Sequence, residues 1–259
     1  MRGTFLLVWA LVMTVAASQQ TARIFATPQN ITTLVIAGVH ARERITTHVA
    51  SMLSSRAYLR EKSLTTSRPG KLIIVPEVVK GSESCWRGNF NNVDINRNFP
   101  VNWRLTSPDS KFLDYGGSKP LSEPESRYIY GLLETHRPDL FIDLHSGEVA
   151  VYTPWHAKLQ QASTALSAQD LVLRIPELRG VKAGAGGLVG GYMAYGTIAD
   201  TALEHFGARC VFTFEIYGEP QTDCKRMFNP PHSEWHALSE HWASIVEQTM
   251  TECERALYN

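Results

Sequence analysis

Apolar runs of strand length alternate with longer segments of helical periodicity along this chain, and this alternation restricts the fold more than any other feature. The strand-like runs are residues 33–39, 71–75, 140–144, 149–152 and 209–214, and the helical segments are residues 46–59, 123–135, 155–168, 199–206 and 233–254. Such alternation predicts an α/β fold, in which a mixed, largely parallel twisted sheet is covered by helices on both faces. Ligands of such sheets bind outside the carboxyl ends of the strands, so functional side chains should directly follow apolar runs.

The composition fits one domain without a global charge. The chain has 259 residues, of which 44% are hydrophobic and 19% are charged. This is enough to bury the core of a single domain over residues 18–259. Lys plus Arg and Asp plus Glu both number 25, so no excess charge favours nucleic acid or an anionic membrane as a partner. Any attraction to a charged substrate must be local.

The first residues differ in character from the rest of the chain. Arg2 precedes an apolar stretch at residues 5–13, and small residues follow at 15–18. This order is typical of a secretory signal peptide, which we place at residues 1–17. The alternative is a membrane anchor, but the stretch is shorter than the roughly 20 residues that span a bilayer. We therefore expect no membrane span after cleavage, and a protein that is secreted or lies in the lumen of a vesicle or vacuole.

The cysteines fit an oxidising compartment. The chain has four, Cys85, Cys210, Cys224 and Cys253, and none has the spacing of a CxxC metal site. They predict two disulfide bonds, for which three pairings are possible. Because Cys85 precedes one polar cluster and Cys224 follows another, a bond between them would tie together two loops beside a shared site.

Polar side chains that suit zinc follow three of the apolar runs. His40 and Glu43 lie just beyond the run at 33–37, and His145 directly follows the run at 141–144. Two imidazoles and a carboxylate are typical zinc ligands, and a catalytic zinc keeps a further position for water. Glu215 ends the apolar run at 211–214, where burial would raise its pKa toward the range of a general base. These four residues predict a zinc-dependent hydrolase.

With these residues in place, the chain resembles the zinc carboxypeptidases of the carboxypeptidase A type, the M14 metallopeptidases. The motifs that carry the resemblance are a first-ligand motif at 40–43, an oxyanion-arginine segment at 85–89, an Asn-Arg carboxylate clamp at 93–100, a third-ligand motif at 144–147, a segment for a mobile tyrosine at 191–197 and a general-base segment at 212–215. The tail segments at 215–218 and 224–230 look most similar to secreted members of plant and protist type.

The resemblance implies a secreted metallocarboxypeptidase that uses one Zn²⁺ ion to hydrolyse the C-terminal peptide bond of peptides or proteins. Its implied site residues are the zinc ligands His40, Glu43 and His145, the general base Glu215, the oxyanion residue Arg87, and the substrate-binding residues Asn96, Arg97, Tyr192 and Arg42. Zinc would acidify its bound water, whose proton Glu215 would remove. The planar fork of Arg97 beside the amide of Asn96 suits a free terminal carboxylate, which explains a cut at the C-terminus.

The expected specificity pocket carries no acid. His156 lies 11 residues after His145, at a place where relatives that prefer basic residues carry an aspartate. Ile198 or Ala199 is the other expected pocket position, and both are uncharged. The resemblance therefore implies a preference for neutral or apolar terminal residues, with the open alternative that a protonated histidine favours an acidic one.

Two departures from the family pattern concern the N-terminal side of the domain. No inhibitory prodomain is recognisable in the sequence. Only about two dozen residues lie between the predicted cleavage site and His40, so we expect the sheet to lack the first edge elements of its relatives.

Other functions remain open at this stage. A zinc amidase or deacylase that acts on cell-wall peptides or N-acyl amino acids would share the metal ligands, and an inactive relative would bind peptides without cleaving them. The glycine-rich stretch at 184–187 does not predict a nucleotide loop, because we expect neither a strand before it nor a helix directly after it. We expect a monomer.

Overall fold

The computed structural model describes residues 21–67, 69–81, 85–109 and 113–258. The predicted signal peptide at 1–17 lies outside these residues. Among the described residues, no helix has the length and apolar character required to cross a bilayer.

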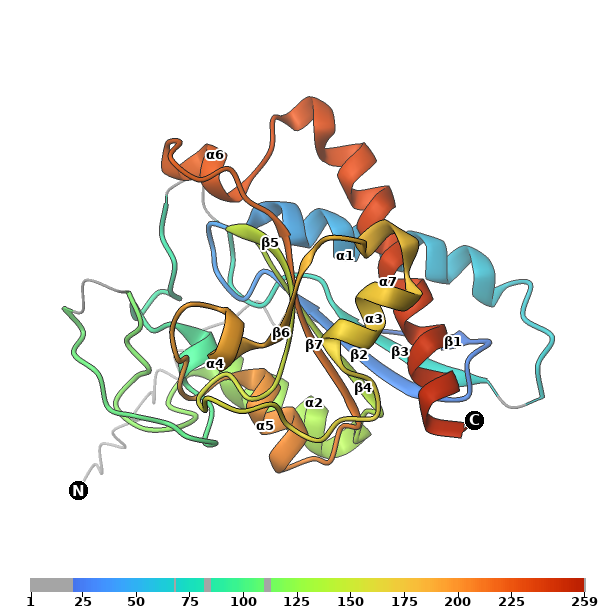
Figure 1. Ribbon diagram of the computed structural model, residues 1–259, viewed down its shortest axis with the longest axis horizontal. Helices are drawn as coiled ribbons and strands as arrows, with labels where there is room; N and C mark the ends of the chain where they lie inside the picture. The colour runs from blue at the N-terminus through green and yellow to red at the C-terminus, as the bar shows by residue number, and fades with distance from the viewer. Residues whose placement is uncertain (1–20, 68, 82–84, 110–112, 259) are drawn as a thin grey trace, which may run out of the picture.

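One sheet forms the centre of the domain (Figure 1). Its strands are β1 (Arg23–Thr27), β2 (Thr32–Ala37), β3 (Gly70–Val75), β4 (Leu140–His145), β5 (Glu148–Thr153), β6 (Lys182–Ala185) and β7 (Cys210–Tyr217), in the order β1-β3-β2-β4-β7-β5-β6. Only the β1–β3 and β5–β7 pairs are antiparallel. The prediction of a mixed, largely parallel sheet is confirmed. The expected loss of edge elements is corrected in part, since β1 supplies an edge strand ahead of β2.

Helices cover both faces of the sheet (Figure 1). They are α1 (Arg44–Glu61), α2 (Pro124–His136), α3 (Ala168–Arg174), α4 (Gly186–Val189), α5 (Ile198–Glu204), α6 (Cys224–Phe228) and α7 (Trp235–Tyr258), with short 3-10 turns at Ile95–Arg97, Pro176–Leu178 and His232–Glu234. The apolar sides of α1, α3 and α7 pack on one face, and those of α2 and α5 pack on the other. The helices predicted near α1, α2, α5 and α7 are thus present, with ends that differ by a few residues.

The two-residue period of the central strands divides the core into two layers. Along β2, Val35 and Ala37 belong to the apolar cluster under α1 and α7, whereas Leu34 and Ile36 belong to the cluster above α2 and α5. All four side chains are fully buried. Because successive strand residues point to opposite faces, a continuous apolar run is what a strand covered on both sides requires.

The predicted helix at 155–168 is wrong. Residues 155–165 form bends and irregular backbone, and α3 begins only at Ala168, where the hydroxyl of Ser167 accepts the N–H of Asp170 at 3.0 Å. Tertiary hydrogen bonds replace the helical ones, since the carbonyls of Trp155 and His156 accept the N–H groups of Gly187 and Ala194. The apolar spacing of this segment reflects contacts with the domain rather than a helix.

The expectation about the glycine-rich stretch is also corrected. Strand β6 leads into it, and the single helical turn α4 follows directly. Glycine is required at 186, because a Cβ atom there would lie 2.5 Å from Cδ2 of the His156 ring. The stretch therefore allows the backbone to pass closely over a side chain.

Two disulfide bonds join distant parts of the chain. Of the three possible pairings, the structure has the one that joins the loops beside the two polar clusters: Cys85 pairs with Cys224, and Cys210 pairs with Cys253. The first bond fixes the loop before the Asn-Arg segment to the start of α6, and the second fixes β7 to α7. The two disulfides fit a secreted or lumenal protein.

Candidate zinc site

The candidate site lies at the carboxyl ends of neighbouring parallel strands. His145 ends β4 and is paired in register with Glu215 on β7. Glu43 occupies the position just before α1, and its carboxylate makes no helix-cap hydrogen bond. That carboxylate instead faces both His40 and His145. Side chains from three separate chain segments therefore meet at one edge of the sheet, as the strand-exit pattern predicted.

The geometry and chemistry of three buried side chains fit a zinc ion. Among the described residues, His40, Glu43 and His145 form the one group whose donor atoms could share a metal, all within 4.8 Å of one another. Glu43 Oε1 lies 2.7 Å from His40 Nδ1, and Glu43 Oε2 lies 2.9 Å from His145 Nδ1. Burial alone would raise the pKa of Glu43, but the two histidines outweigh it and hold that pKa well below its ordinary value. Two imidazole nitrogens and an ionised carboxylate are a typical zinc donor set.

The sequence interpretation did not identify the carboxylates that orient the two histidines. Asp94 Oδ1 lies 3.0 Å from His40 Nε2, and Asp143 Oδ2 lies 2.9 Å from His145 Nε2. Both aspartates are buried. A carboxylate on the far nitrogen fixes the ring and strengthens the facing nitrogen as a ligand, so this outer layer also fits a zinc site.

One of these aspartates carries a signal in the sequence. Asp143 stands two residues before His145 in the otherwise apolar strand β4, where every side chain is buried. Residues two apart share a face of a strand, so Phe141, Asp143 and His145 point the same way. A charged residue in such a buried position requires a partner, and the nearest imidazole along the strand is His145.

Asp143 and Glu43 also set the charge of His145. Burial alone would lower the pKa of His145, but these two carboxylates outweigh it and raise that pKa well above its ordinary value. A metal cation at Glu43 would replace the proton on His145 Nδ1, because one nitrogen cannot bind both.

Glu215 has the environment expected of a general base. Its Oε2 atom is buried and has no hydrogen-bond partner among the described residues. Burial, supported by the carboxylates Glu43 and Glu148, raises the pKa of Glu215 to about 8, against the opposing charges of His145 and Arg87. A carboxylate with a raised pKa accepts a proton more readily than one in water.

Arg87 lies beside the metal ligands. Its Nε and Nη2 atoms each lie 2.8 Å from Asp94 Oδ2, and its Nη1 atom lies 4.0 Å from Glu43 Oε1. Burial alone would lower the pKa of Arg87, but Asp94 and Glu43 outweigh it and raise that pKa, so the guanidinium stays charged. Because the two bonds to Asp94 fix its plane, Nη1 remains directed toward the metal ligands.

The residues of the expected carboxylate clamp have different environments. The Asn96 amide donates from Nδ2 toward Asp143 Oδ2 at 3.3 Å, and its Oδ1 accepts the N–H of Ile198 at 2.9 Å. Arg97 Nη1 donates to the carbonyl of Asn96 at 2.8 Å, and its Nη2 lies 3.5 Å from the hydroxyl of Tyr192. Tyr192 is 65% exposed, so its ring is free to move. Arg97 is therefore better placed than Asn96 to contact a ligand.

His156 is held by an acid that is not among the predicted site residues. Asp200 is fully buried, and its Oδ1 lies 3.2 Å from His156 Nδ1 and accepts the His156 N–H at 2.9 Å. Its Oδ2 accepts the N–H of Ala157. The Nε2 atom of His156 lies 3.3 Å from the hydroxyl of Thr213. The histidine is thus a fixed wall of the site rather than a solvent-facing side chain.

One cavity of about 240 Å³ joins most of the predicted site residues. Its walls include His40, Arg42, Glu43, Arg87, Asn96, Arg97, His145, His156, Tyr192 and Glu215. Ile198 and Ala199, the two candidates for the other expected pocket position, lie instead in the apolar cluster around α5, where both are buried. Glycines 186 and 190, Ala194 and Thr213 line the cavity beside His156 in their place.

Comparison with known families agrees with this geometry. The sequence profile described as zinc carboxypeptidase matches residues 10–244. The chain belongs to the zinc carboxypeptidase family. Within this family, the murein peptide amidase A of Escherichia coli (strain K12) is 26% identical over 136 residues, which cover 49% of this chain and 53% of the amidase.

Two other proteins show the breadth of the likeness. The uncharacterized protein YqgT of Bacillus subtilis (strain 168) is 32% identical over 87 residues, which cover 31% of this chain and 23% of YqgT. The matched parts thus span about half or less of these two curated relatives. The bovine thrombin-activatable fibrinolysis inhibitor, solved with a tick carboxypeptidase inhibitor, is 21% identical, with a TM-score of 0.71 over 87% of this chain and 83% of that one. This last likeness shows the carboxypeptidase fold.

Proposed function

We propose that this protein is a secreted or lumenal zinc metallocarboxypeptidase that hydrolyses the C-terminal peptide bond of peptides or proteins. The proposal rests mainly on one arrangement: a buried zinc donor set, the carboxylate of Glu215 and the guanidinium of Arg97 line the same cavity. A metal site alone fits many hydrolases. A cation placed to read a free carboxylate beside it favours an exopeptidase.

The zinc ligands of the proposed enzyme are His40, Glu43 and His145. When bound, zinc supplies a Lewis acid that polarises a carbonyl and lowers the pKa of water. Glu215 takes a proton from the attacking water and returns it to the leaving amine, a role that its raised pKa supports. Arg87, held in plane by Asp94, stabilises the negative charge that develops on the carbonyl oxygen.

The remaining residues position the substrate. Arg97 binds the terminal carboxylate, and Tyr192 closes over the bound residue from its exposed position. Asn96 supports this site mainly by fixing Asp143 and the backbone of Ile198. Arg42, which lines the same cavity, contacts the preceding peptide carbonyl.

The terminal side chain is proposed to be neutral or apolar. The part of the cavity beside His156 is lined by small residues and the ring of Tyr152. Asp200 lies behind His156, with both oxygens occupied by N–H donors, so it offers no free charge to a terminal Lys or Arg. Efficient removal of a C-terminal Lys would contradict this preference.

The similarity to a murein peptide amidase favours a second candidate, an amidase that acts on cell-wall peptides. The two functions share the metal ligands and the base. They differ in substrate, because the carboxypeptidase requires an ordinary peptide with a free terminal carboxylate.

The test compares zinc-loaded wild-type protein with Glu215→Gln on peptides that end in a free carboxylate, on the same peptides with a terminal amide, and on murein peptides. We expect cleavage of the free peptides alone, and a loss of about 10²–10⁴-fold in kcat for Glu215→Gln. Glu134→Gln, an exposed change on α2, is the matched control and should leave turnover unchanged. Equal turnover by wild type and Glu215→Gln would overturn the mechanism. Cleavage of murein peptides alone would favour the amidase, and peptide binding without turnover would indicate an inactive relative.

A further inference from the structure

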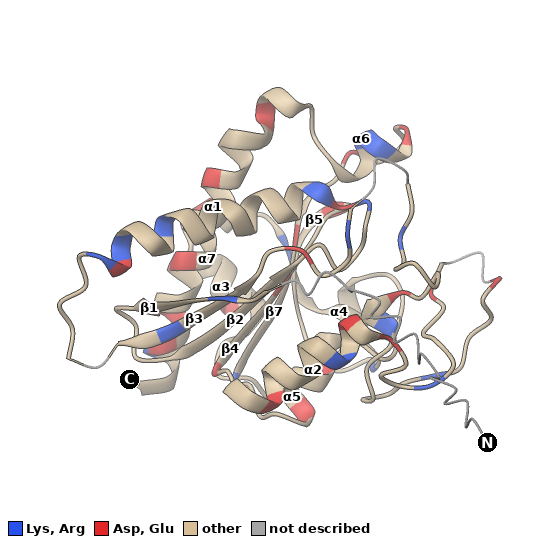
Figure 2. Cartoon of the chain, turned by 180° about the vertical axis from the view of Figure 1, so that it is seen from behind, with Lys and Arg blue, Asp and Glu red and all other residues tan. Residues whose placement is uncertain are grey.

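A second cavity, of about 280 Å³, lies against the Cys85–Cys224 disulfide, and its described lining residues are all basic or neutral. The residues that give it its character are Arg42, Arg44, Lys225, Arg226, His232 and Trp235, and none of its described lining residues is acidic. We call it the α6 cavity, since Cys224, Lys225 and Arg226 belong to α6. Figure 2 shows basic segments on α6 and at the start of α1 on the same side of the domain.

The α6 cavity is next to the candidate zinc site. Arg42 lines both cavities, and its guanidinium lies 4.0 Å from the centre of the Phe228 ring. Phe228 lines the catalytic cavity, whereas the next residue, Asn229, lines the α6 cavity. A peptide whose C-terminus lies in the catalytic cavity therefore has the α6 cavity directly across Arg42.

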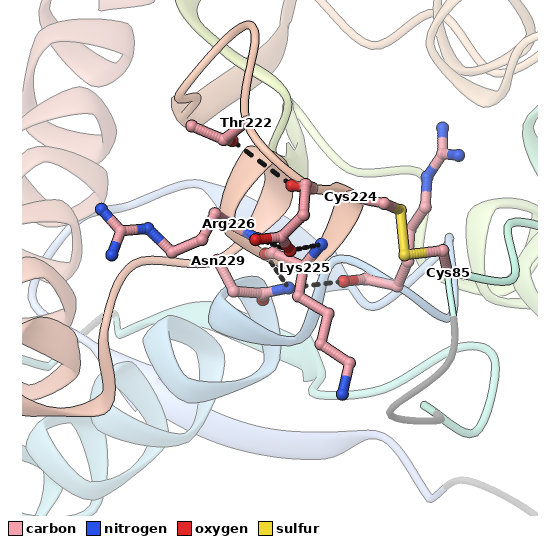
Figure 3. The surroundings of a disulfide bond; sticks show 8 residues. Cys85, Thr222, Cys224, Lys225, Arg226 and Asn229 are labelled. Carbon is pink, nitrogen blue, oxygen red and sulfur yellow. Dashed lines mark hydrogen bonds between the residues drawn. A yellow bond between two sulfur atoms is a disulfide. The ribbon is translucent and has the colours of Figure 1, made fainter.

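The walls of the α6 cavity are fixed by bonds between distant segments. The disulfide joins the Cys85 loop to the first residue of α6, beside Lys225, Arg226 and Asn229 (Figure 3). Asn229 Nδ2 donates to the carbonyl of Arg42 at 2.8 Å, and Asn229 Oδ1 accepts the N–H of Ile45 at 2.9 Å. Covalent and hydrogen bonds between distant segments therefore hold these walls in place.

The aromatic wall is fixed in a similar way. Trp235 donates from its ring N–H to the carbonyl of Pro230 at 2.8 Å. Its ring is stacked on that of His232 and meets that of His48 edge-on, with both ring centres 4.5 Å away. An apolar face beside several cations suits a ligand with a short aliphatic stem and a charged end.

The charge of the α6 cavity is only partly balanced. Arg226 pairs with Glu219 at 2.8 Å, and Asp223 accepts the backbone N–H groups of Lys225 and Arg226. The ammonium of Lys225 has no ion-pair partner among the described residues. The Nε atom of Arg42 is buried and has no hydrogen-bond partner there either. Since the chain as a whole has a net charge of zero, this positive charge is a local feature.

We propose that the α6 cavity binds the carboxylate of an Asp or Glu side chain that lies upstream of the scissile bond, so that the enzyme favours acidic peptide substrates. The proposal rests on the proposed function. A substrate side chain is favoured over an unrelated anion because the two cavities share Arg42, so the α6 cavity lies next to a peptide held in the catalytic cavity.

The test uses pairs of peptides with the same terminal residue and either Glu or Gln at one of the second to fifth positions from the C-terminus. At low salt, we expect the kcat/KM of wild type to be up to about fivefold higher for the Glu peptide than for the Gln peptide at one position. This is the effect of one partly exposed ion pair. Lys225→Gln should reduce this ratio toward one without changing kcat/KM for the Gln peptide. Lys225→Glu should reverse it, and should favour a peptide with Lys at the same position. Lys71→Gln, at the amino end of β3 and far from the cavity, is the control.

Three results of these kcat/KM measurements would overturn the proposal. The first is a Glu-to-Gln ratio of one at every position in wild type, and the second is a ratio that Lys225→Gln and Lys225→Glu leave unchanged. The third is a loss of kcat/KM in the Lys225 variants that is equal for the Glu and the Gln peptide.

A binding measurement separates this proposal from the proposed function. Zinc-loaded Glu215→Gln protein should bind the labelled Glu peptide more tightly than the Gln peptide, and Lys225→Gln should abolish the difference. If no peptide is cleaved by wild type, the proposed function fails, yet this binding comparison still decides whether the cavity selects an acidic side chain. Competition by inorganic phosphate or sulfate that affects both peptides equally would indicate a general anion site and would also count against the proposal.

Discussion

The carboxylate of Asp94 joins His40 to Arg87, because its Oδ1 lies 3.0 Å from His40 Nε2 and its Oδ2 lies 2.8 Å from Arg87 Nε. One buried residue thus orients a metal ligand with one oxygen and the proposed oxyanion group with the other. Burial alone would raise the pKa of Asp94, but Arg87, His40 and Arg97 lower it well below its ordinary value, so Asp94 stays ionised at neutral pH.

Asp94→Asn should weaken both functions together. We expect zinc affinity to fall by about 10- to 100-fold, since the substitution removes the carboxylate behind a zinc-ligating histidine. Zinc affinity is measured by competition with a chelator, and kcat/KM is measured on zinc-saturated protein, where the misplaced Arg87 should still reduce turnover. Asp109→Asn, on an exposed loop, is the control. Unchanged zinc affinity would show that Asp94 does not support His40.

Zinc binding should depend on pH because of His145. Its raised pKa means that the zinc-free protein holds a proton on this imidazole at neutral pH, and zinc must displace that proton. Affinity should therefore rise with pH until His145 loses its proton in the zinc-free state. Calorimetry in buffers of different ionisation enthalpy measures how many protons are released when zinc binds. We expect about one proton per zinc. Zinc binding without proton release would contradict the assigned charge of His145.

Glu123 should contribute stability that acid removes. Burial alone would raise its pKa, but hydrogen bonds from Asn89, Asn91 and Ser122 outweigh burial and lower it from the ordinary value of 4.5. A group with a lowered pKa stabilises the fold above its ordinary pKa, and this stability is lost as pH falls through the lower, folded-state pKa.

Glu123→Gln is accordingly expected to reduce the free energy of unfolding by about 1–2 kcal/mol at neutral pH, because a charged acceptor is lost. The difference from wild type should narrow as pH falls below about 4.5. Urea unfolding at several pH values measures it, with Glu134→Gln on α2 as the control. A difference that stays constant down to acid pH would assign the effect to packing instead of charge.

Asp200 is expected to act on specificity through His156. Asp200→Asn replaces one acceptor oxygen by a donor in a place where three N–H groups converge, so we expect a loss of about 1–3 kcal/mol in the free energy of unfolding. His156 should also lose its fixed orientation. A panel of peptides that end in Phe, Leu, Glu and Lys measures kcat/KM, and the differences between these peptides should shrink in Asp200→Asn. His156→Gln should change the order of preference with a smaller loss of stability, and an unchanged order in both variants would remove this pair from specificity.

Tertiary contacts explain where the sequence prediction failed. The segment at 155–168 has helical spacing of apolar residues, but its carbonyl groups bond to Gly187 and Ala194, more than 30 residues away, so no helix forms. Either Ile198 or Ala199 was expected to line the pocket. In the fold, α5 turns both side chains into the apolar core and leaves Asp200 behind His156.

The sequence by itself determined the sheet and the places of the main site residues. Continuous apolar runs specify strands buried on both faces, and in a largely parallel sheet their carboxyl ends meet, so His145 and Glu215 had to lie together. Only the tertiary structure decided which carboxylates orient the site histidines and which basic residues surround the α6 cavity. Asp94 meets His40 across 54 residues. The Cys85–Cys224 disulfide and the hydrogen bond from Asn229 to the carbonyl of Arg42 bring Arg42 and the basic residues of α6 to the walls of one cavity. Such contacts depend on side-chain directions and loop paths, which the periodicity of a single chain does not specify.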